Sequence, residues 1–216
     1  EARAADEATD MIVELITGSD DDMRLMAIQQ VSEAAPGKDA TKRFVALLPK
    51  LKPDMQAKMI DALGTRGDAT ARPAILAMLT SKTPAIRVAA AGALAAMASP
   101  DDVPALAKQA AAGSEAEQDA ARQCLRKLKG EKMNAAMIKA MKDADPKTKI
   151  ELINALTDRN VTSASPTIAK GLGDSEQTVR TATLKSLSAM GDETHTTALV
   201  KHMKAAKDPK ERRQTA

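Results

Sequence analysis

The sequence predicts an all-α fold, a right-handed α-α superhelix of about seven helical hairpins with a 31-residue period. Three observations predict it: an apolar position that recurs at a fixed step, a composition suited to packed helices, and prolines at equivalent helix starts. The recurring position is occupied by Val31, Leu63, Leu94, Leu125, Leu156 and Leu187, each 31 or 32 residues after the one before. A step of this size is typical of repeat proteins, whose units gain stability by stacking on one another.

The composition favours closely packed helices over sheets. Of the 216 residues 44% are hydrophobic, and Phe44 is the single aromatic residue. Ala, Leu, Ile and Met fill the apolar positions; small and unbranched side chains suit helices, whereas strands favour β-branched and aromatic ones. A chain of this length can bury a substantial core, and 28% charged residues is ordinary for a folded protein.

Each unit is predicted to contain two helices, called here the first helix and the second helix. Fifteen residues before each recurring position stands another apolar anchor, at Ile16, Leu48, Leu79, Ala110, Met141, Leu172 and Met203. Four residues earlier come Ile12, Phe44, Ile75, Leu106, Met137, Ile168 and Leu199. Apolar residues four apart share a helix face, and the gap of 15 leaves room for a turn and a second helix. The hairpins are therefore expected at about 5–35, 39–67, 70–98, 102–129, 133–159 and 164–190, with a seventh from 194 onwards.

Proline, capping residues and glycine divide the units at matching places. Prolines mark helix starts, at Pro73, Pro104 and Pro166 for the first helix and at Pro53, Pro84 and Pro146 for the second. Thr83 and Asp145 are predicted N-caps of second helices. Gly67, Gly191 and the region of Gly130 are predicted to end second helices in the left-handed conformation.

We expect residues 1–216 to form a single solenoid domain, because the period covers the whole sequence. The chain begins at Glu1 and ends at Ala216, where the last second helix has only just begun, so it reads as a piece of a longer chain. Residues 1–20 lack the apolar segment of a signal peptide, and no run approaches the roughly 18 apolar residues of a membrane span. No membrane insertion is expected.

The formal net charge of +3 is unevenly distributed. Residues 1–33 carry nine acidic and two basic residues, whereas residues 193–216 carry six basic and three acidic ones. The basic excess thus lies in one terminal segment. This pattern favours a solvated helix face over a nucleic-acid site, which would need a continuous basic groove.

A resemblance to a known repeat family is carried by two copies of one phrase. Ile86–Ala91 (IRVAAA) corresponds to Val179–Leu184 (VRTATL), and Asp102–Leu106 (DVPAL) opens a first helix. These phrases resemble the short bacterial HEAT repeat, including the variety called PBS-lyase HEAT-like, and the resemblance covers essentially the whole chain. Units one, two and five depart from the pattern: Gln56 and Lys149 replace its Arg, and no proline opens their first helices.

In HEAT-like solenoids the second helices line the concave side, so the resemblance implies a partner-binding surface on their outward faces. The candidate partner-binding residues are Asp61, Val88, Gly92, Ala96, Gln123, Asn154 and Lys185. Amide-rich and apolar rows suit a polypeptide or a neighbouring domain better than phosphate, the alternative being an ordinary mixed surface. The segment 85–100 is small and apolar nearly all round, so we expect its neighbours to approach closely; the alternative is an exposed apolar patch.

Three arginines recur near the start of second helices, at Arg24, Arg87 and Arg180. We expect each to pair with an acid of the adjacent loop and to fix the geometry between repeats; the acids considered are Asp20, Asp22 and Asp174. An anion-binding ladder is the less favoured interpretation.

Other isolated signals are interpreted as structural or incidental. Cys124 is predicted to be a packed thiol, and a lone cysteine excludes an internal disulfide. His195 and His202 are seven apart, roughly 10 Å along a helix, too far to chelate one metal ion. The tripeptide 66–68 (RGD) falls at a turn that requires Gly and Asp. We therefore predict no metal site, no catalytic residues and no cofactor.

The favoured function is a non-catalytic scaffold that binds a protein or an adjacent domain of the same polypeptide. The first alternative is a domain of an enzyme, of the phycobilin lyase type or beside a hydrolase; one Phe and two His offer little to a tetrapyrrole. The second is a nucleic-acid module, which lacks stacking platforms here. Similar HEAT segments occur in multidomain bacterial envelope proteins, so the resemblance implies a periplasmic or envelope location and leaves open a separate catalytic domain. Partner identity and oligomeric state stay open.

Overall fold

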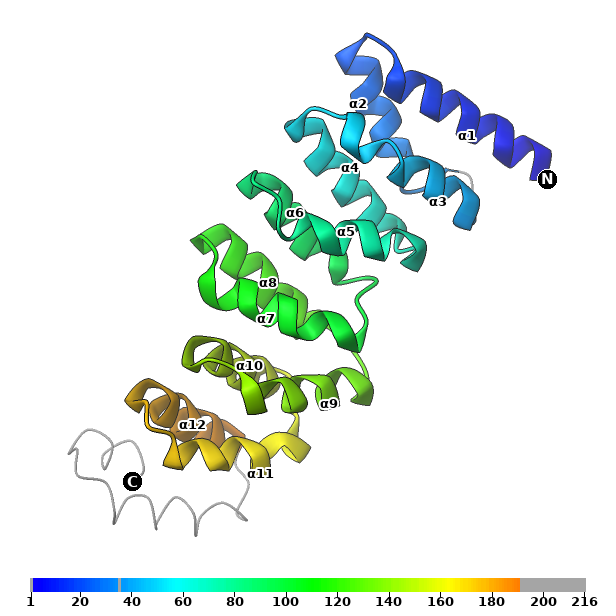
Figure 1. The fold of residues 1–216 in the computed structure, drawn as a ribbon. Coiled ribbons are helices and arrows are strands. Elements are labelled where there is room, and N and C mark those ends of the chain that lie inside the picture. The colour runs from blue at the N-terminus through cyan, green and yellow to red at the C-terminus, as the bar shows by residue number, and fades with distance from the viewer. Residues whose placement is uncertain (1, 35, 191–216) are drawn as a thin grey trace.

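The computed structural model describes residues 2–34 and 36–190, with side chains from residue 6 onwards, and over this part of the chain it is all-helical (Figure 1). The first helices are α1 (Ala2–Thr17), α3 (Lys38–Val45), α5 (Arg72–Met78), α7 (Val103–Ala112), α9 (Glu131–Ala140) and α11 (Ser165–Ile168). The second helices are α2 (Asp21–Gln30), α4 (Pro53–Arg66), α6 (Pro84–Leu94), α8 (Glu115–Lys127), α10 (Pro146–Asp158) and α12 (Gln177–Met190). Short 3-10 turns precede or extend several first helices: η1 (Leu48–Lys50), η2 (Ala69–Ala71), η3 (Pro100–Asp102), η4 (Met141–Asp143), η5 (Thr162–Ala164) and η6 (Ala169–Gly173).

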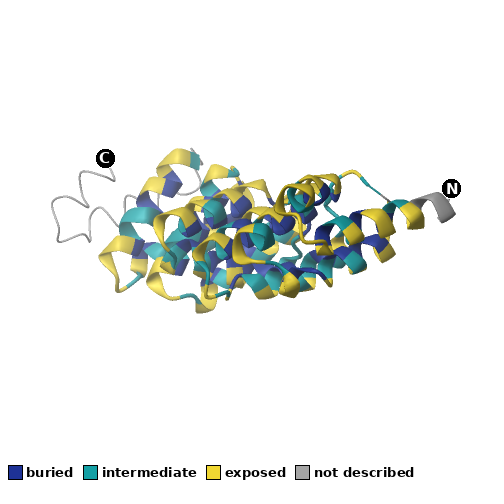
Figure 2. Cartoon of the chain, turned by 90° about the horizontal axis from the view of Figure 1, so that it is seen from above, coloured by how far each residue is buried: buried dark blue, intermediate teal, exposed yellow. Residues whose placement is uncertain are grey.

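The twelve helices form six hairpins stacked into an elongated solenoid, with first helices in one layer and second helices in the other (Figure 1). The predicted anchors build the core between these layers. The recurring second-helix anchors are at most 2% exposed, and the first-helix anchors from Ile16 to Leu172 are at most 9% exposed. Figure 2 shows the buried segments inside and the exposed segments along the outer surfaces. The predicted α solenoid is thus confirmed; the expected seventh hairpin, with Leu199 and Met203, lies outside the described residues.

One hairpin cannot bury both of its sides, which explains why the hairpins stack. Burying a Leu or Ile side chain contributes about 1.5–3 kcal/mol, against an ordering cost of about 1–2 kcal/mol per residue. Stability therefore depends on the junctions between hairpins. The junction between α4 and α6 is close: a Cβ added to Gly64 would stand 2.7 Å from both Cα and Cβ of Ala93. This confirms the expected close approach on one side of α6.

Helix starts follow the prolines, as predicted, and the caps agree in part. Asp145 caps α10, its carboxylate accepting from the amides of Lys147 and Thr148 at 3.1 Å. Thr83 holds the N-cap position of α6, but its side chain makes no capping bond. The Thr83 amide donates to the Ser81 hydroxyl at 3.2 Å.

The glycine predictions also agree in part. Gly67 ends α4 in the left-handed conformation, with φ +69°, as predicted. Gly130 does not end α8 but precedes α9 as its N-cap residue, with φ +96°. The helix α8 has already ended at Lys127, and the next residue, Leu128, is no longer helical (φ −59°, ψ 131°) and is buried in the core. Gly191 lies outside the described residues.

Two arginines three residues after the anchors Leu63 and Leu156 reach back to the preceding hairpin. Arg66 donates to the carbonyls of Val31 and Ala34 at 3.0 and 2.6 Å, and its guanidinium stands 5.5 Å from the Phe44 ring centroid. Its counterpart Arg159 donates to the Leu125 carbonyl at 3.2 Å. These bonds satisfy carbonyls at the ends of α2 and α8 that have no partner within the helix.

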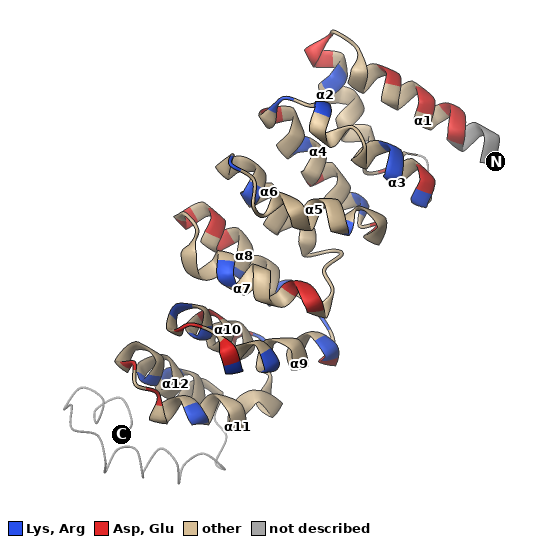
Figure 3. Cartoon of the chain, viewed as in Figure 1, with Lys and Arg blue, Asp and Glu red and all other residues tan. Residues whose placement is uncertain are grey.

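Ion pairs cross the junctions between hairpins, and Figure 3 marks the basic and acidic positions along the helices. From the third hairpin on, the cation comes from the earlier hairpin and the carboxylate from the later one: Arg72 with Asp102 at 2.7 Å, Arg87 with Glu117 at 2.6 Å, Arg122 with Glu151 at 2.7 Å and Lys149 with Asp174 at 2.6 Å. At the first junction the order is reversed, with Arg43 and Lys52 reaching back to Asp10 and Asp21. In the later hairpins, the side facing the N-terminus is therefore the acidic side.

The recurring arginines bind the turn between the two helices of their own hairpin, mainly through carbonyl oxygens. Arg24 donates to the Ile16 carbonyl at 2.9 Å, Arg87 to that of Ser81 at 2.6 Å, and Arg180 to that of Ser175 at 2.9 Å. The expected acidic partners agree in part. Asp20 caps α2 instead. The pKa of the Asp174 carboxyl is lowered first by the hydrogen bond from Lys149 and also by the charge of Arg180, as expected for that pair. Arg24 pairs with Asp21, and Arg87 with Glu117 of the next hairpin.

Candidate partner-binding groove on the second helices

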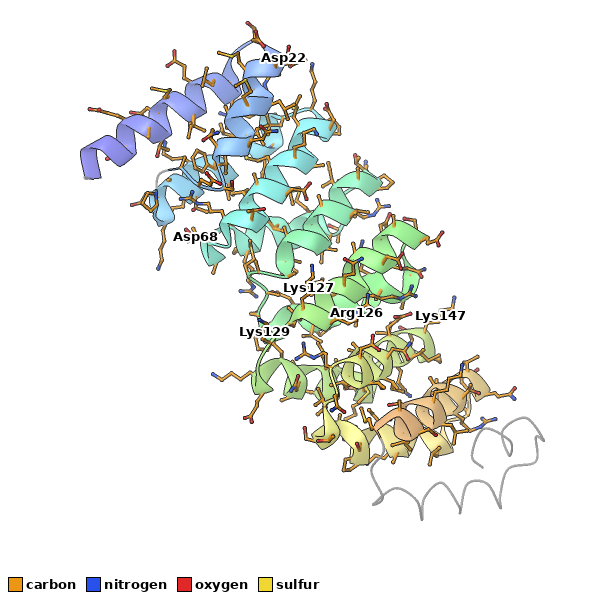
Figure 4. The ribbon with its side chains drawn as sticks, turned by 180° about the vertical axis from the view of Figure 1, so that it is seen from behind. Asp22, Asp68, Arg126, Lys127, Lys129 and Lys147 are labelled. Atoms are coloured by element: carbon orange, nitrogen blue, oxygen red, sulfur yellow. The ribbon has the colours of Figure 1, made fainter. Side chains whose placement is uncertain are left out.

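A groove of about 570 Å³ crosses the outward faces of α4, α6 and α8, and we call it the second-helix groove. Small apolar residues line its centre: Ala57, Ala85, Val88, Ala89, Gly92, Ala95 and Ala120. Polar residues stand at its two sides: Asp54, Lys58 and Asp61 on α4, and Gln123 and Lys127 on α8. Figure 4 views this side of the molecule, with Lys127 labelled at the α8 side. The groove therefore combines an apolar floor with a hydrogen-bonding rim.

The 31-residue period explains why these side chains meet. Asp61, Gly92 and Gln123 each stand two residues before a buried anchor, and Val88 stands six before one. These offsets place a side chain on the helix face away from the anchor. Because α4, α6 and α8 repeat the same orientation, the three outward faces join into one surface.

The structure brings together four of the seven candidate residues. Asp61, Val88, Gly92 and Gln123 line the second-helix groove. Asn154 lies in a separate hollow of about 280 Å³ between α8 and α10, which Glu151 also lines. Ala96 and Lys185 are exposed but line neither hollow. The predicted row is thus interrupted rather than continuous.

Of the charged rim, the sequence analysis anticipated Asp61 but not Asp54, Lys58 or Lys127. Asp54, Lys58 and Asp61 follow at intervals of four and three residues, so they share one face of α4. Lys127 lies one helical turn after Gln123 on α8. Extending each predicted position by one turn in both directions would have found Lys58 and Lys127, and a second turn would have found Asp54.

One carboxylate of the groove has a perturbed affinity for protons. Although Asp61 is accessible to solvent, desolvation by the walls of the groove raises the pKa of its carboxyl, and the Lys58 ammonium opposes that shift. A desolvated carboxylate has lost part of its hydration, so a hydrogen-bond donor from a partner would compensate it.

Cys124 is a packed thiol, as predicted. It is 1% exposed, and burial raises the pKa of its thiol to about 12. A thiol in this state is not a nucleophile at neutral pH. No set of three or more His, Cys, Asp or Glu side chains within residues 6–34 and 36–190 is arranged to hold a metal ion. His195 and His202 lie outside the described residues.

The tripeptide 66–68 is used structurally, in agreement with the sequence interpretation. Gly67 ends α4, and the Asp68 carboxylate accepts from the Thr70 amide at 2.9 Å and from the Thr41 hydroxyl at 2.7 Å. Both hydrogen bonds lower the pKa of the Asp68 carboxyl below its usual value. The bond from the Thr70 amide has the larger effect, and the bond from the Thr41 hydroxyl the next largest.

A larger hollow, about 860 Å³, lies on the opposite side between α7 and α9. Ala105, Ala136 and Ala140 line it, with Lys108 and Lys139 among the charged residues at its margin. The sequence reasoning missed this hollow, since it followed the second helices alone; alanines at equivalent first-helix positions were the available signal.

None of the described helices is long and apolar enough to span a bilayer.

Comparison with known proteins agrees with this architecture. The sequence profile of HEAT repeats matches residues 41–126 and 134–216. A search of curated proteins finds no match. Among solved structures, the complex of CpcE and CpcF of phycocyanin lyase from Nostoc sp. PCC7120 is similar, with a TM-score of 0.52 and 18% identity over 88% of this chain and 80% of that one.

Two further solved structures are similar. An engineered protein has a TM-score of 0.52 and 18% identity over 84% of this chain and 98% of that chain. The Escherichia coli protein YibA has a TM-score of 0.50 and 15% identity over 99% of this chain and 81% of that chain. At these identities the likenesses establish the fold. Together with the sequence match, which covers most of the residues, they show that the chain belongs to the HEAT-repeat family.

Proposed function

We propose that this chain is a non-catalytic protein-interaction scaffold that holds a polypeptide segment, from a partner or an adjacent domain, in the second-helix groove. The observation that carries the proposal is the groove itself, which joins an apolar floor on α6 to polar rims on α4 and α8. Peptide-binding sites need both features, because side chains are buried while the peptide backbone keeps its hydrogen bonds. Gln123 offers a donor and an acceptor, and Asp61 offers an acceptor.

Gly92 supports the proposal, because a glycine at this position lowers the stability of the helix without being needed for packing. It lies in the last turn of α6, and a Cβ built on it meets nothing within 4 Å. A glycine inside a helix costs about 0.5–1 kcal/mol relative to alanine, so packing does not require Gly92. Its side-chain-free position does keep the floor of the groove open for a close approach of another backbone.

The groove favours a polypeptide over the other two ligand classes considered. Its rim carries both signs of charge, with two acids and two lysines, where a nucleic-acid site would present an excess of cations. A tetrapyrrole site would be expected to offer aromatic walls, and the groove has none. The similarity to phycocyanin lyase concerns the fold.

The test uses peptides selected on the purified protein from a random phage-displayed library. Affinities of the selected peptides are then measured for the wild type, Val88→Glu and Gln123→Glu. We expect at least about tenfold weaker binding to both variants, since a carboxylate is placed in the floor or on the rim. Ala105→Glu, on the opposite face, serves as the matched control and should bind normally. Unchanged binding of every selected peptide to both groove variants would refute the proposal.

A further inference from the structure

The smallest side chains of the second-helix groove lie on α6, between larger ones on the two neighbouring helices. Asp61, Gly92 and Gln123 hold the same position relative to their anchors, so the middle helix has no side chain where its neighbours carry polar ones. Figure 1 shows α6 between α4 and α8 in the stack. At the two ends of the lined stretch of α6 stand Ala85 and Ala95. The groove therefore runs along α6, with its rims on α4 and α8.

The groove has the dimensions of a helix. Ala85 and Ala95 are ten residues apart, which corresponds to about 15 Å along a helix axis. Helices in contact lie about 8–10 Å apart, so the axes of α4 and α8 are separated by roughly 16–20 Å. An α-helix with its side chains is about 10–12 Å wide. One helix therefore fits between the two rims, over about three of its turns.

The floor of the groove offers few hydrogen-bond partners to a bound backbone. Residues 88–92 lie inside α6, where amides and carbonyls bond within the helix. Among the residues that line the groove, Gln123 carries the single uncharged side chain with strong donor and acceptor groups, and it stands on a rim. An extended segment laid on this floor would bury amides and carbonyls without partners, which is unfavourable. A helix makes those bonds within itself, so the floor favours a helical segment.

The two rims differ in charge. The α4 rim has one net negative charge, because two acids flank one lysine: Asp54, Lys58 and Asp61. The α8 rim has one positive charge, from Lys127, which Figure 4 labels. Asp119, also on α8, is paired with Arg122 of the same helix at 3.4 Å. A helix that matches both rims therefore has a basic flank and an acidic flank, one on each side of its apolar stripe.

We propose that the second-helix groove binds an amphipathic helix of a partner or an adjacent domain, laid along α6 with its basic flank against α4 and its acidic flank against α8. The inference rests on the proposed function and adds the conformation and the charge pattern of the segment that is held. The apolar stripe of this helix would cover Val88 and Gly92, where the missing side chain allows two helices to approach closely. A glycine has this role inside the molecule as well, where Gly64 of α4 lies against Ala93 of α6.

The test uses three synthetic helical peptides of about 18 residues, five helical turns. All three carry the same stripe of Leu and Ala and one Trp. Their flanks are Lys on one side and Glu on the other in the mixed peptide, Lys on both sides in the second, and Glu on both sides in the third. Because the protein has no Trp or Tyr, peptide emission reports binding without background. We expect the mixed peptide to bind about tenfold or more tightly than either of the others.

Two changes test the conformation and the place of the bound peptide. A proline at the centre of the mixed peptide, on its solvent side, should weaken binding about tenfold or more, because proline breaks a helix and is compatible with an extended chain. Val88→Glu on the floor should weaken binding of the mixed peptide by a similar factor. Ala105→Glu, on the opposite face, is the matched control and should bind it normally.

Charge reversal on one rim gives a gain that a misfolded variant would not show. Asp54→Lys/Asp61→Lys makes both rims basic, so this variant should bind the peptide with two Glu flanks about tenfold or more tightly than the mixed peptide. Circular dichroism checks that the variant is folded.

The inference would be overturned if the mixed peptide did not bind, if all three peptides bound equally, if the central proline had no effect, or if the folded rim variant kept the preference of the wild type. Any of these results would leave the proposed function standing as long as peptides selected from the random library still lose affinity for Val88→Glu. Failure of that selection as well would refute both.

Discussion

Gly64 and Gly92 lie on neighbouring helices in opposite surroundings, which predicts opposite effects of adding one methyl group. Gly64→Ala would push a Cβ to 2.7 Å from Ala93 and force α4 and α6 apart, a destabilisation of about 1–3 kcal/mol. Gly92→Ala meets nothing within 4 Å and should stabilise by about 0.5–1 kcal/mol through helix propensity. Urea unfolding followed by circular dichroism measures both. Shifts of the same sign would show that the close approach is misplaced.

Cys124 gives a second prediction at the residue level. Its thiol is 1% exposed and its pKa is raised to about 12 by burial, so at pH 8 it should react slowly with a thiol reagent such as DTNB. In urea the same thiol should react completely within minutes, as an ordinary cysteine does. Rapid stoichiometric reaction of the folded protein would contradict the burial of this side chain beneath the groove.

At the scale of the helices, the ion pair between Arg87 on α6 and Glu117 on α8 tests how much a contact between hairpins contributes to stability. The Glu117 side chain is 4% exposed, and it also accepts from the Ser114 hydroxyl at 3.0 Å. Arg87→Met would leave the Glu117 carboxylate without its cation, and we expect the free energy of unfolding to fall. The double variant Arg87→Met/Glu117→Gln should recover part of that loss, because the stranded charge is gone. A double variant less stable than Arg87→Met would exclude this explanation.

The same pair predicts a pH dependence. The hydrogen bond from Arg87 lowers the pKa of the Glu117 carboxyl in the folded state, whereas the unfolded chain has a value of about 4.3. A lowered folded pKa contributes stability that is present above the unfolded pKa and is lost as pH falls through the folded pKa. Between about pH 5 and pH 3 the wild type should therefore lose more stability than Glu117→Gln. Parallel urea midpoints for the two proteins across this range would contradict the assignment.

For the whole molecule, the repeat period decided how much of the fold could be predicted. Leu63, Leu94 and Leu125 are fully buried because a 31-residue step returns each second helix to the same orientation. Local details depend on single contacts and were less accessible. Thr83 occupies an N-cap position without making the capping bond, and Gly130 begins a helix because α8 ends early.

At the candidate site, too, the repeat period predicted the positions of residues but not the local shape of the surface. Asp61, Gly92 and Gln123 could be placed on one surface, since their offsets from the anchors are equal. The depth of the surface could not be predicted, because it depends on side-chain size in three neighbouring helices at once. Hence Asn154, at the same offset, lies in a different hollow.

The most direct test of the account places a reporter on the rim of the groove. Lys127→Cys can be labelled specifically with bimane, because Lys127 is exposed and the native Cys124 is buried. A selected peptide carrying one Trp quenches bimane on contact, and the protein has no Trp of its own. The account predicts strong quenching at position 127 and none for bimane on Ala105→Cys, on the opposite face. Quenching at position 105 alone, or tight binding without quenching at position 127, would contradict the claim that this solenoid binds polypeptides in its second-helix groove.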